Sequence, residues 1–332
     1  MFIIESYQVA VVFCFVTMLS WGSWANTQKL AASTWRFELF YWDYVIGILL
    51  CSFLFGITLG SNGEGGRGFI EDLQQADGQN YVLAFSGGII FNLANILIVA
   101  AISIAGMSVA FPVGIGLALI LGVILNYISQ QKGDAVLLFI GVGLVLVAVV
   151  LDALAYKKLS GIRAKDPSKG LKFAIIGGIL MSLFYYFVQK SMSLDFTNPM
   201  AGKFTPYGAV FVFAVGVFIS NFIFNTILMK RPVEGPPLNY QAYFSSSFGV
   251  HLIGILGGII WCTGMSLSII SAEKAGPAIS YGLGQGATMV AAIWGVFVWK
   301  EFKHASGNTH ALLAAMFAFF ILGLSLIIYA GM

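Results

Sequence analysis

Two titratable side chains lie inside long apolar stretches of this sequence and could carry protons. Asp43 stands five residues beyond Glu38 in one such stretch, and His251 stands near the start of another. A carboxyl group in apolar surroundings can bind a proton reversibly, and imidazole exchanges protons near neutral pH. We therefore predict that Asp43 and His251 form an ion-coupling site. The alternative is that Asp43 is an interfacial hydrogen-bonding group and His251 packs one helix against another.

Uncharged polar side chains in the apolar stretches are candidates for binding a polar molecule. Amide groups both donate and accept hydrogen bonds, which suits a solute with hydroxyl or amide groups. Asn92 and Asn95 are three residues apart and share one face of a helix. The polar members of the predicted substrate site are Asn26, Asn92, Asn95, Tyr281 and Gln285. Their alternative role is hydrogen bonding between helices, which is common in membranes.

Three tryptophans complete the predicted substrate site. Trp21 and Trp24 share a helix face, and Trp261 lies deep in a later stretch. An indole ring can lie against the C–H face of a sugar or stack on a planar solute; packing in the core is the alternative. Tryptophan is also favoured at membrane interfaces, and we assign that role to Trp35, Trp42 and Trp299.

Several charged residues stand at the ends of the apolar stretches. Lys29 and Lys190 close two stretches that correspond in the repeat described below, and we predict cationic gates at two opposite mouths. Their alternative is to extend toward the headgroups as topology markers. Glu38 follows Arg36 and is expected to form a surface ion pair. The remaining carboxylates are expected to be hydrated at the interface: Asp134, Asp152, Glu273 and Glu301.

Other chemistries find no support in the sequence. No G-x-x-x-x-G-K-[S/T] loop, H-E-x-x-H or G-x-S-x-G motif is present, so ATP hydrolysis and the common hydrolases are not indicated. The three histidines are scattered, so neither a metal nor a cofactor is expected. The three cysteines, each in an apolar run, are expected to be buried and free: Cys14, Cys51 and Cys262. The chain is not expected to be an enzyme.

The composition requires a membrane. Of the 332 residues, 59% are hydrophobic and only 9% are charged, against about 25% in soluble domains. A water-soluble globule would lack a polar surface, and disorder needs the opposite composition. The net charge of +3 is too small to indicate nucleic acid.

Ten stretches reach the length of about 20 residues that an apolar helix needs to cross a bilayer. They are 7–28, 38–60, 81–104, 107–128, 134–156, 171–190, 207–229, 248–272, 276–299 and 308–330. Such long continuous runs exclude a porin-like barrel. The longest hydrophilic connection, Ser61–Asn80, is expected to be a solvated loop with no catalytic or binding residues. We predict an all-α integral membrane protein with ten transmembrane helices, residues 1–332 forming one membrane domain.

The distribution of positive charge predicts the orientation. Residues 157–172 carry six lysines and arginines, more than any other connection. By the positive-inside rule, 157–170 is a basic cytoplasmic linker and both termini face outward. The predicted location is the plasma (inner) membrane.

The sequence contains an internal repeat. Gly87-Gly88-Ile89-Ile90-Phe91 recurs as Gly257-Gly258-Ile259-Ile260-Trp261, and Gln28-Lys29 recurs as Gln189-Lys190. These echoes align residues 1–156 with residues 171–332. Because each half has an odd number of helices, the halves must be inserted with opposite topology. We predict a 5+5 inverted repeat, which is typical of secondary transporters with a substrate site between the halves.

Four segments carry a family resemblance: Gly106-Met107-Ser108, Gly114-Ile115-Gly116, Gly257-Gly258-Ile259-Ile260-Trp261 and Trp299-Lys300-Glu301-Phe302. Through them the chain resembles the drug/metabolite transporter (DMT) superfamily and, within it, the sugar-permease branch with the L-rhamnose–proton symporters. Asn95 lies where the rhamnose-type pattern has an Asn. Tyr41-Trp42-Asp43-Tyr44 instead resembles the related ureide permeases.

The resemblance implies alternating access and proton-coupled uptake of a monosaccharide or deoxysugar such as rhamnose. The alternatives are a ureide or nucleobase permease for allantoin or uracil, and a DMT-type exporter of metabolites or drugs. The expected partners are the solute, a coupling ion (proton rather than sodium) and lipid, with the chain a monomer or homodimer.

Overall fold

The computed structural model describes residues 1–31, 35–159 and 166–332, and helices dominate these ranges. In chain order they are α1 (Tyr7–Ser23), α2 (Ala25–Ala31), α3 (Phe37–Ile57), α4 (Phe69–Gln75), α5 (Gly78–Ala105), α6 (Met107–Ser129), α7 (Ala135–Leu159), α8 (Pro167–Ser191), α9 (Pro206–Lys230), α10 (Tyr240–Phe244), α11 (Phe248–Ala275), α12 (Pro277–Gly284), α13 (Ala287–Ile293), the π-helical turn η1 (Trp294–Val298) and α14 (Gly307–Tyr329).

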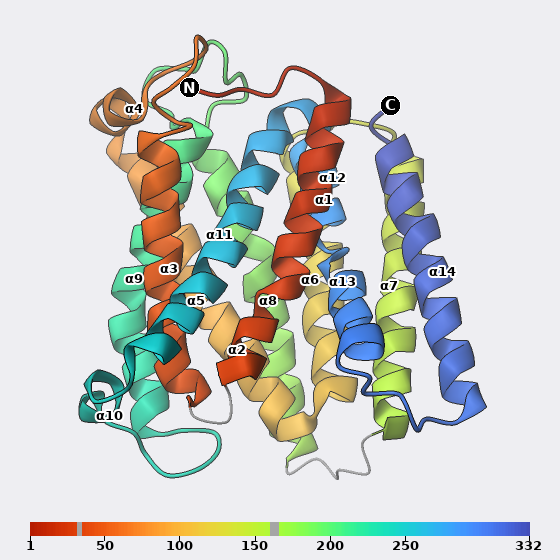
Figure 1. The fold of residues 1–332 in the computed structure, drawn as a ribbon. Helices are drawn as coiled ribbons and strands as arrows, with labels where there is room; N and C mark the ends of the chain where they lie inside the picture. Colours follow the sequence, from red (N-terminus) through yellow and green to blue (C-terminus); the bar gives the residue numbers. More distant parts are fainter. Residues whose placement is uncertain (32–34, 160–165) are drawn as a thin grey trace.

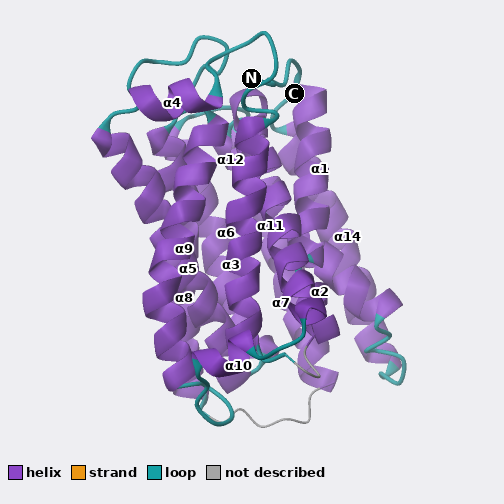
Figure 2. Ribbon diagram, turned by 60° about the vertical axis from the view of Figure 1, so that its left-hand side comes forward, coloured by secondary structure: helices purple, strands orange, loops and turns teal. Residues whose placement is uncertain are grey.

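The helices form one upright bundle, with the loops gathered at its two ends (Figures 1 and 2). Within the described ranges, ten helical segments are long and apolar enough to cross a membrane, which confirms the predicted all-α membrane fold. Both termini lie at the end that carries α4, and α10 lies at the opposite end (Figure 1). We call these the terminal end and the linker end. Arg163 and Lys165 of the predicted basic linker lie outside the described residues.

Two spans are interrupted, whereas most are continuous. The first span consists of α1 and α2, which meet at Trp24, and the ninth consists of α12, α13 and η1, with a break at Gln285 and Gly286. Short helices with a break between them are the segments that line solute sites in many transporters, because the break frees backbone polar groups inside the bundle. The breaks therefore mark these two spans as candidates for the site.

The helices of the two halves pack in a similar pattern. Helix α5 of the first half packs on α8 and α9 of the second half. Helix α11 of the second half packs on α1 and α3 of the first, and α7 pairs with α14. A Cβ on Gly88 would lie 2.1 Å from the Phe213 carbonyl of α9, and one on Gly258 would lie 1.9 Å from the Tyr44 carbonyl of α3. Equivalent glycines thus permit equivalent close crossings. These crossings support the 5+5 inverted repeat, which stays a prediction.

The connection between the second and third spans differs from its prediction. Ser61–Asn80 contains α4, and Asp72 of that helix is fully buried. Its carboxylate accepts hydrogen bonds from Thr205 N and Oγ1, both at 2.9 Å, and pairs with Arg67 at 3.1 Å. Burial raises the pKa of Asp72, and the bonds from Thr205 and Arg67 oppose that rise. The connection was predicted to be a solvated loop because charges in a glycine-rich stretch do not reveal a tertiary partner.

A similar clasp lies at the linker end. Arg36 donates to the carbonyls of Pro236 at 2.7 Å and Glu234 at 2.8 Å, and it pairs with Glu38 at 2.6 Å. The predicted Arg36–Glu38 pair is present, but Glu38 is buried rather than on the surface. The three cysteines are free and buried, as predicted.

The glycine crossings generate a stability prediction. Gly88→Ala places a methyl group on the Phe213 carbonyl, so α5 and α9 must separate. Overpacking of this kind costs about 1–3 kcal/mol, and we expect a lower midpoint of thermal unfolding in detergent. Gly143→Ala is the matched control, because a Cβ there meets no atom within 4 Å. Equal midpoints for both variants would contradict the proposed crossing.

Candidate functional site

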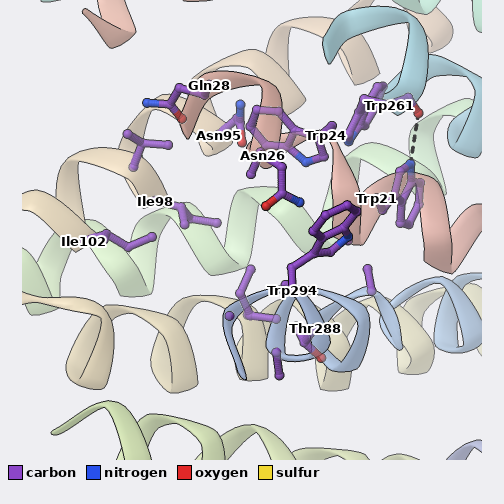
Figure 3. Close-up of a pocket in the computed structure, with 18 of the residues that line it drawn as sticks. Trp21, Trp24, Asn26, Gln28, Asn95, Ile98, Ile102, Trp261, Thr288 and Trp294 are labelled. Atoms are coloured by element: carbon purple, nitrogen blue, oxygen red, sulfur yellow. Dashed lines mark hydrogen bonds between the residues drawn. The ribbon is translucent and has the colours of Figure 1, made fainter. Parts of the chain in front are cut away.

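A cavity of about 510 Å³ lies between the two interrupted spans and the helices that face them. The first span contributes residues 21–29, α5 contributes Phe91 and Asn95, and α11 contributes Trp261. The ninth span supplies the opposite wall from Gly284 to Gly295. Figure 3 shows Trp21, Asn26 and Trp294 among the side chains that line this space.

Aromatic rings close the inner end of the cavity. The rings of Trp21 and Trp261 stack with centroids 5.9 Å apart, and the Trp21 N–H donates to the Trp261 carbonyl at 3.2 Å (Figure 3). The ring centroid of Phe91 lies 4.3 Å from that of Trp261, and the Phe213 ring stacks on Trp261 with the centroids 6.1 Å apart. We call Trp21, Phe91 and Trp261 the aromatic floor.

The cavity opens toward the linker end. Phe91 and Trp261 on the floor are buried, whereas Lys29, Ser103 and Glu301 along the lining are exposed. Ser103 lies two residues before the end of α5. The structure therefore shows a conformation with access from one end and a closed aromatic layer toward the other.

Polar groups on the walls are oriented by neighbours. Asn26 donates to the Ser23 carbonyl at 3.0 Å and accepts from the Trp299 indole at 2.6 Å. Asn95 donates to the Tyr41 hydroxyl at 3.2 Å. An amide that is held by one bond keeps its other donor or acceptor in a fixed direction. The walls thus present preoriented amides beside flat rings.

Most of the predicted substrate residues converge on this cavity. They are Trp21, Trp24, Asn26, Asn95, Trp261 and Gln285. Asn92 and Tyr281 do not line it. Asn92 donates to Val217 O at 3.2 Å and Ser220 Oγ at 2.9 Å, and the Tyr281 hydroxyl donates to Ala118 O at 3.1 Å. Both side chains are fully buried and connect helices, which is the alternative role considered for such groups.

Asp43 and His251 lie together, but outside the cavity lining. His251 Nδ1 is 2.9 Å from Asp43 Oδ1, the Tyr243 hydroxyl donates to the same oxygen at 2.6 Å, and the Trp35 indole donates to Oδ2 at 3.0 Å. Asp43 is 1% exposed. Trp35 is therefore a buried partner of this carboxyl group, which corrects its assignment as an interfacial anchor. Burial raises the pKa of Tyr243, and contact with the Asp43 carboxyl group raises it further.

The two predicted gate lysines lie at opposite ends of the bundle. Lys29 pairs with Glu301 at 2.5 Å at the mouth of the cavity and lies 4.3 Å from the Trp299 ring. Lys190 lies near the terminal end of α8, with its Nζ 5.4 Å from the Tyr186 ring. The ion pair is partly exposed to solvent, so we expect it to contribute at most about 1 kcal/mol. Their gating role stays a prediction.

Several lining residues were not predicted as such. Asp152 and Glu301 were expected at a hydrated interface, and Trp299 was expected to be an anchor, yet all three line the cavity. Asp152 is only 4% exposed, because α7 continues for seven residues beyond it to Leu159. That distance is about 10 Å along a helix, enough to place the carboxyl group well inside the bundle. Within the described ranges, no three His, Cys, Asp or Glu side chains are grouped to hold a metal ion.

Comparison with known proteins identifies the family. The sequence pattern of the ureide permease family matches residues 40–168 and 157–330 of this chain. The chain belongs to the ureide permease family. Ureide permease 1 of Arabidopsis thaliana is 24% identical to this permease and is matched over 98% of each chain. Ureide permease 2 of the same plant is 25% identical over 97% of this permease and 96% of its own length. The probable ureide permease A3 of Vigna unguiculata is 22% identical over 93% and 99%.

The fold has a counterpart among solved structures. A protein of known crystal structure aligns with this permease at a TM-score of 0.59 and 15% identity, covering 97% of this chain and 98% of the other. The match concerns the fold alone. The family match and the ten apolar spans show that the chain is a multi-pass membrane transporter, and the family favours the ureide alternative over the sugar interpretation. Its relation to the DMT superfamily and the rhamnose symporters stays a prediction.

The one-sided cavity can be tested by labelling in oriented membrane vesicles. Ser103→Cys should react with a membrane-impermeant maleimide from the same face as Ser168→Cys, because both positions are exposed at the linker end. Ser280→Cys is the matched control and should stay unlabelled, since Ser280 is fully buried beyond the floor. Labelling of Ser103→Cys only from the face opposite to Ser168→Cys would refute this opening.

Proposed function

We propose that this permease transports a small, neutral, planar solute rich in N–H and C=O groups, namely a ureide or a related nitrogen heterocycle. The observation that carries the proposal is the combination of flat rings and amide side chains in one cavity. Five tryptophans line it, together with Asn26, Gln28, Asn95 and Gln285. The names of the relatives support the same class of solute.

The two kinds of wall serve different parts of such a solute. Indole faces stack on a planar π system, and stacking of a base on an aromatic side chain contributes about 1–3 kcal/mol. Amide side chains pair with both N–H and C=O groups, so Asn95 and Gln285 can match a ureide around its edge. A monosaccharide could also place its C–H face on a ring, which makes sugars the comparison class in any binding experiment.

Transport would proceed by alternating access. The conformation described above is open at the linker end, and the aromatic floor of Trp21, Phe91 and Trp261 blocks the path beyond. Opening the other side requires α1 to move relative to α11, because Trp21 and Trp261 belong to these two helices. A solute stacked on the floor would be released on the other side once these rings separate.

We assign ion coupling to the buried cluster of Asp43, His251, Tyr243 and Trp35, with the proton as the ion. A carboxyl group that faces a histidine can exchange a proton within the pair, and protonation weakens the hydrogen bonds that hold Tyr243 and Trp35. The cluster is connected to the cavity through the next residue, Tyr44, whose ring lies 4.7 Å from Trp24 and 6.4 Å from Trp261.

A thermal-shift screen of the purified permease tests the solute class. A ligand at one hundred times its dissociation constant stabilises the folded state by about 2.7 kcal/mol. We expect allantoin or uracil to raise the unfolding midpoint and rhamnose to leave it unchanged. Trp24→Leu should weaken binding about tenfold, while Trp42→Leu should not, because Trp42 lies outside the cavity with its N–H on Met229 Sδ. Stabilisation by monosaccharides alone would reverse the proposal.

The coupling assignment is tested in proteoliposomes with an imposed proton gradient. Asp43→Asn removes the ionisable group and keeps its shape, so accumulation of the solute against its gradient should fall to equilibration while exchange persists. Asp77→Asn, at an exposed carboxylate at the terminal end, is the control and should accumulate like the wild type. Normal accumulation by Asp43→Asn would place the coupling site elsewhere.

A further inference from the structure

Asp152 is an unusual member of the cavity wall. Its side chain lines the cavity from α7, and the residue is 4% exposed. Within the described part of the chain, its Oδ1 atom is buried and has no hydrogen-bond partner. A buried polar group without a partner is costly, and a charged group inside a membrane protein more so. A bound ligand that donates a hydrogen bond to the Asp152 carboxyl group would offset this cost.

The neighbouring charged groups, Lys29 and Glu301, are paired with each other. Glu301 uses both carboxylate oxygens: Oε1 accepts from Lys29 at 2.5 Å and Oε2 accepts from the Tyr156 hydroxyl at 2.9 Å. Lys29, the cation in the lining, is thereby engaged at the mouth. Of the two carboxylates in the wall, Asp152 is the one with an oxygen that no donor occupies within the described residues, whereas both oxygens of Glu301 are occupied.

The end of the ninth span, which lines the same cavity as Asp152, has an irregular backbone that supports a binding role. The ninth span ends in the π-helical turn η1, and Lys300 has a positive φ of 53°. A Cβ on Gly295 would lie 2.7 Å from the Tyr156 hydroxyl and 3.1 Å from Glu301 Oε2. Glycine at this position therefore allows Tyr156 and Glu301 to pair over the backbone. π-Helical turns and left-handed residues of this kind are frequent at functional sites.

We propose that Asp152 is a solute-contacting residue whose carboxylate accepts the N–H groups of the transported molecule. This inference rests on the proposed function and names the residue that accepts hydrogen bonds from the N–H groups of the solute. A carboxylate only accepts hydrogen bonds, whereas the amides of Asn95 and Gln285 both accept and donate. A ureido group presents two parallel N–H groups, the same fork by which an arginine binds a carboxylate in two places. Asp152 would thus favour solutes that present N–H donors to it over solutes that present only acceptors.

The test combines a change in the protein with a change in the solute. Dissociation constants are measured by titration calorimetry on the full-length purified permease, for allantoin and for an analogue methylated on the ureido nitrogens. We expect the wild type to prefer allantoin by about ten- to one-hundredfold, because a hydrogen bond to a charged group is lost on methylation. In Asp152→Asn and Asp152→Ser this preference should fall close to one.

Asp134→Asn is the matched control, since Asp134 precedes the other end of α7 and is exposed. It should keep the wild-type preference. The unfolding midpoint without ligand gives an independent measure: removing an unpartnered carboxylate should leave Asp152→Asn at least as stable as the wild type, whereas a structural role predicts a loss.

The outcomes separate this inference from the proposed function. A wild type that binds no ureide overturns the proposed function and this inference together. A wild type that binds allantoin with the same preference in Asp152→Asn, Asp152→Ser and Asp134→Asn overturns only the role of Asp152. A wild type that binds allantoin and its methylated analogue equally also overturns that role.

Discussion

Trp21 of α1 lies against Trp261 of α11, with the rings 5.9 Å apart and the indole N–H of one residue bonded to the carbonyl of the other. This contact makes the cavity one-sided, because it joins the interrupted first span to a continuous helix across the solute path. Flat rings can block a path and still offer a stacking surface to a planar molecule. The same residues therefore serve as barrier and as binding site, and separating them would open the other side.

The helices that carry the floor are held by close crossings. Gly258 of α11 meets the backbone of α3, and Gly88 of α5 meets the backbone of α9. Without a hydrophobic drive between helices in lipid, such crossings and interhelical hydrogen bonds provide the packing energy. At the ends of the bundle, Arg67 and Arg36 bind loop carbonyls and fix the connections. The two interrupted spans, which line the cavity, also pack closely on each other, since a Cβ on Gly22 would lie 2.5 Å from the Ala287 carbonyl.

The spans were predictable from the sequence because a helix in lipid must satisfy its own backbone and must be apolar over its length. The contents of the cavity were predictable only in part. Asn92 and Asn95 share one broad helix face, yet Asn92 bonds to α9 and Asn95 lines the cavity. The direction of each depends on which helix lies opposite, and a single sequence does not contain that information. Asp152 was predicted at the hydrated interface for a related reason. Hydropathy locates the end of a span but not how deep a polar side chain lies in the bundle.

The central claim, that this cavity carries a planar N–H-rich solute through the membrane, is tested most directly by counterflow in proteoliposomes. Vesicles that contain the permease are loaded with unlabelled allantoin and diluted into a trace of the labelled compound. The account predicts a transient accumulation of label that excess uracil suppresses and rhamnose does not. Accumulation of labelled rhamnose in rhamnose-loaded vesicles, with none of allantoin, would contradict it.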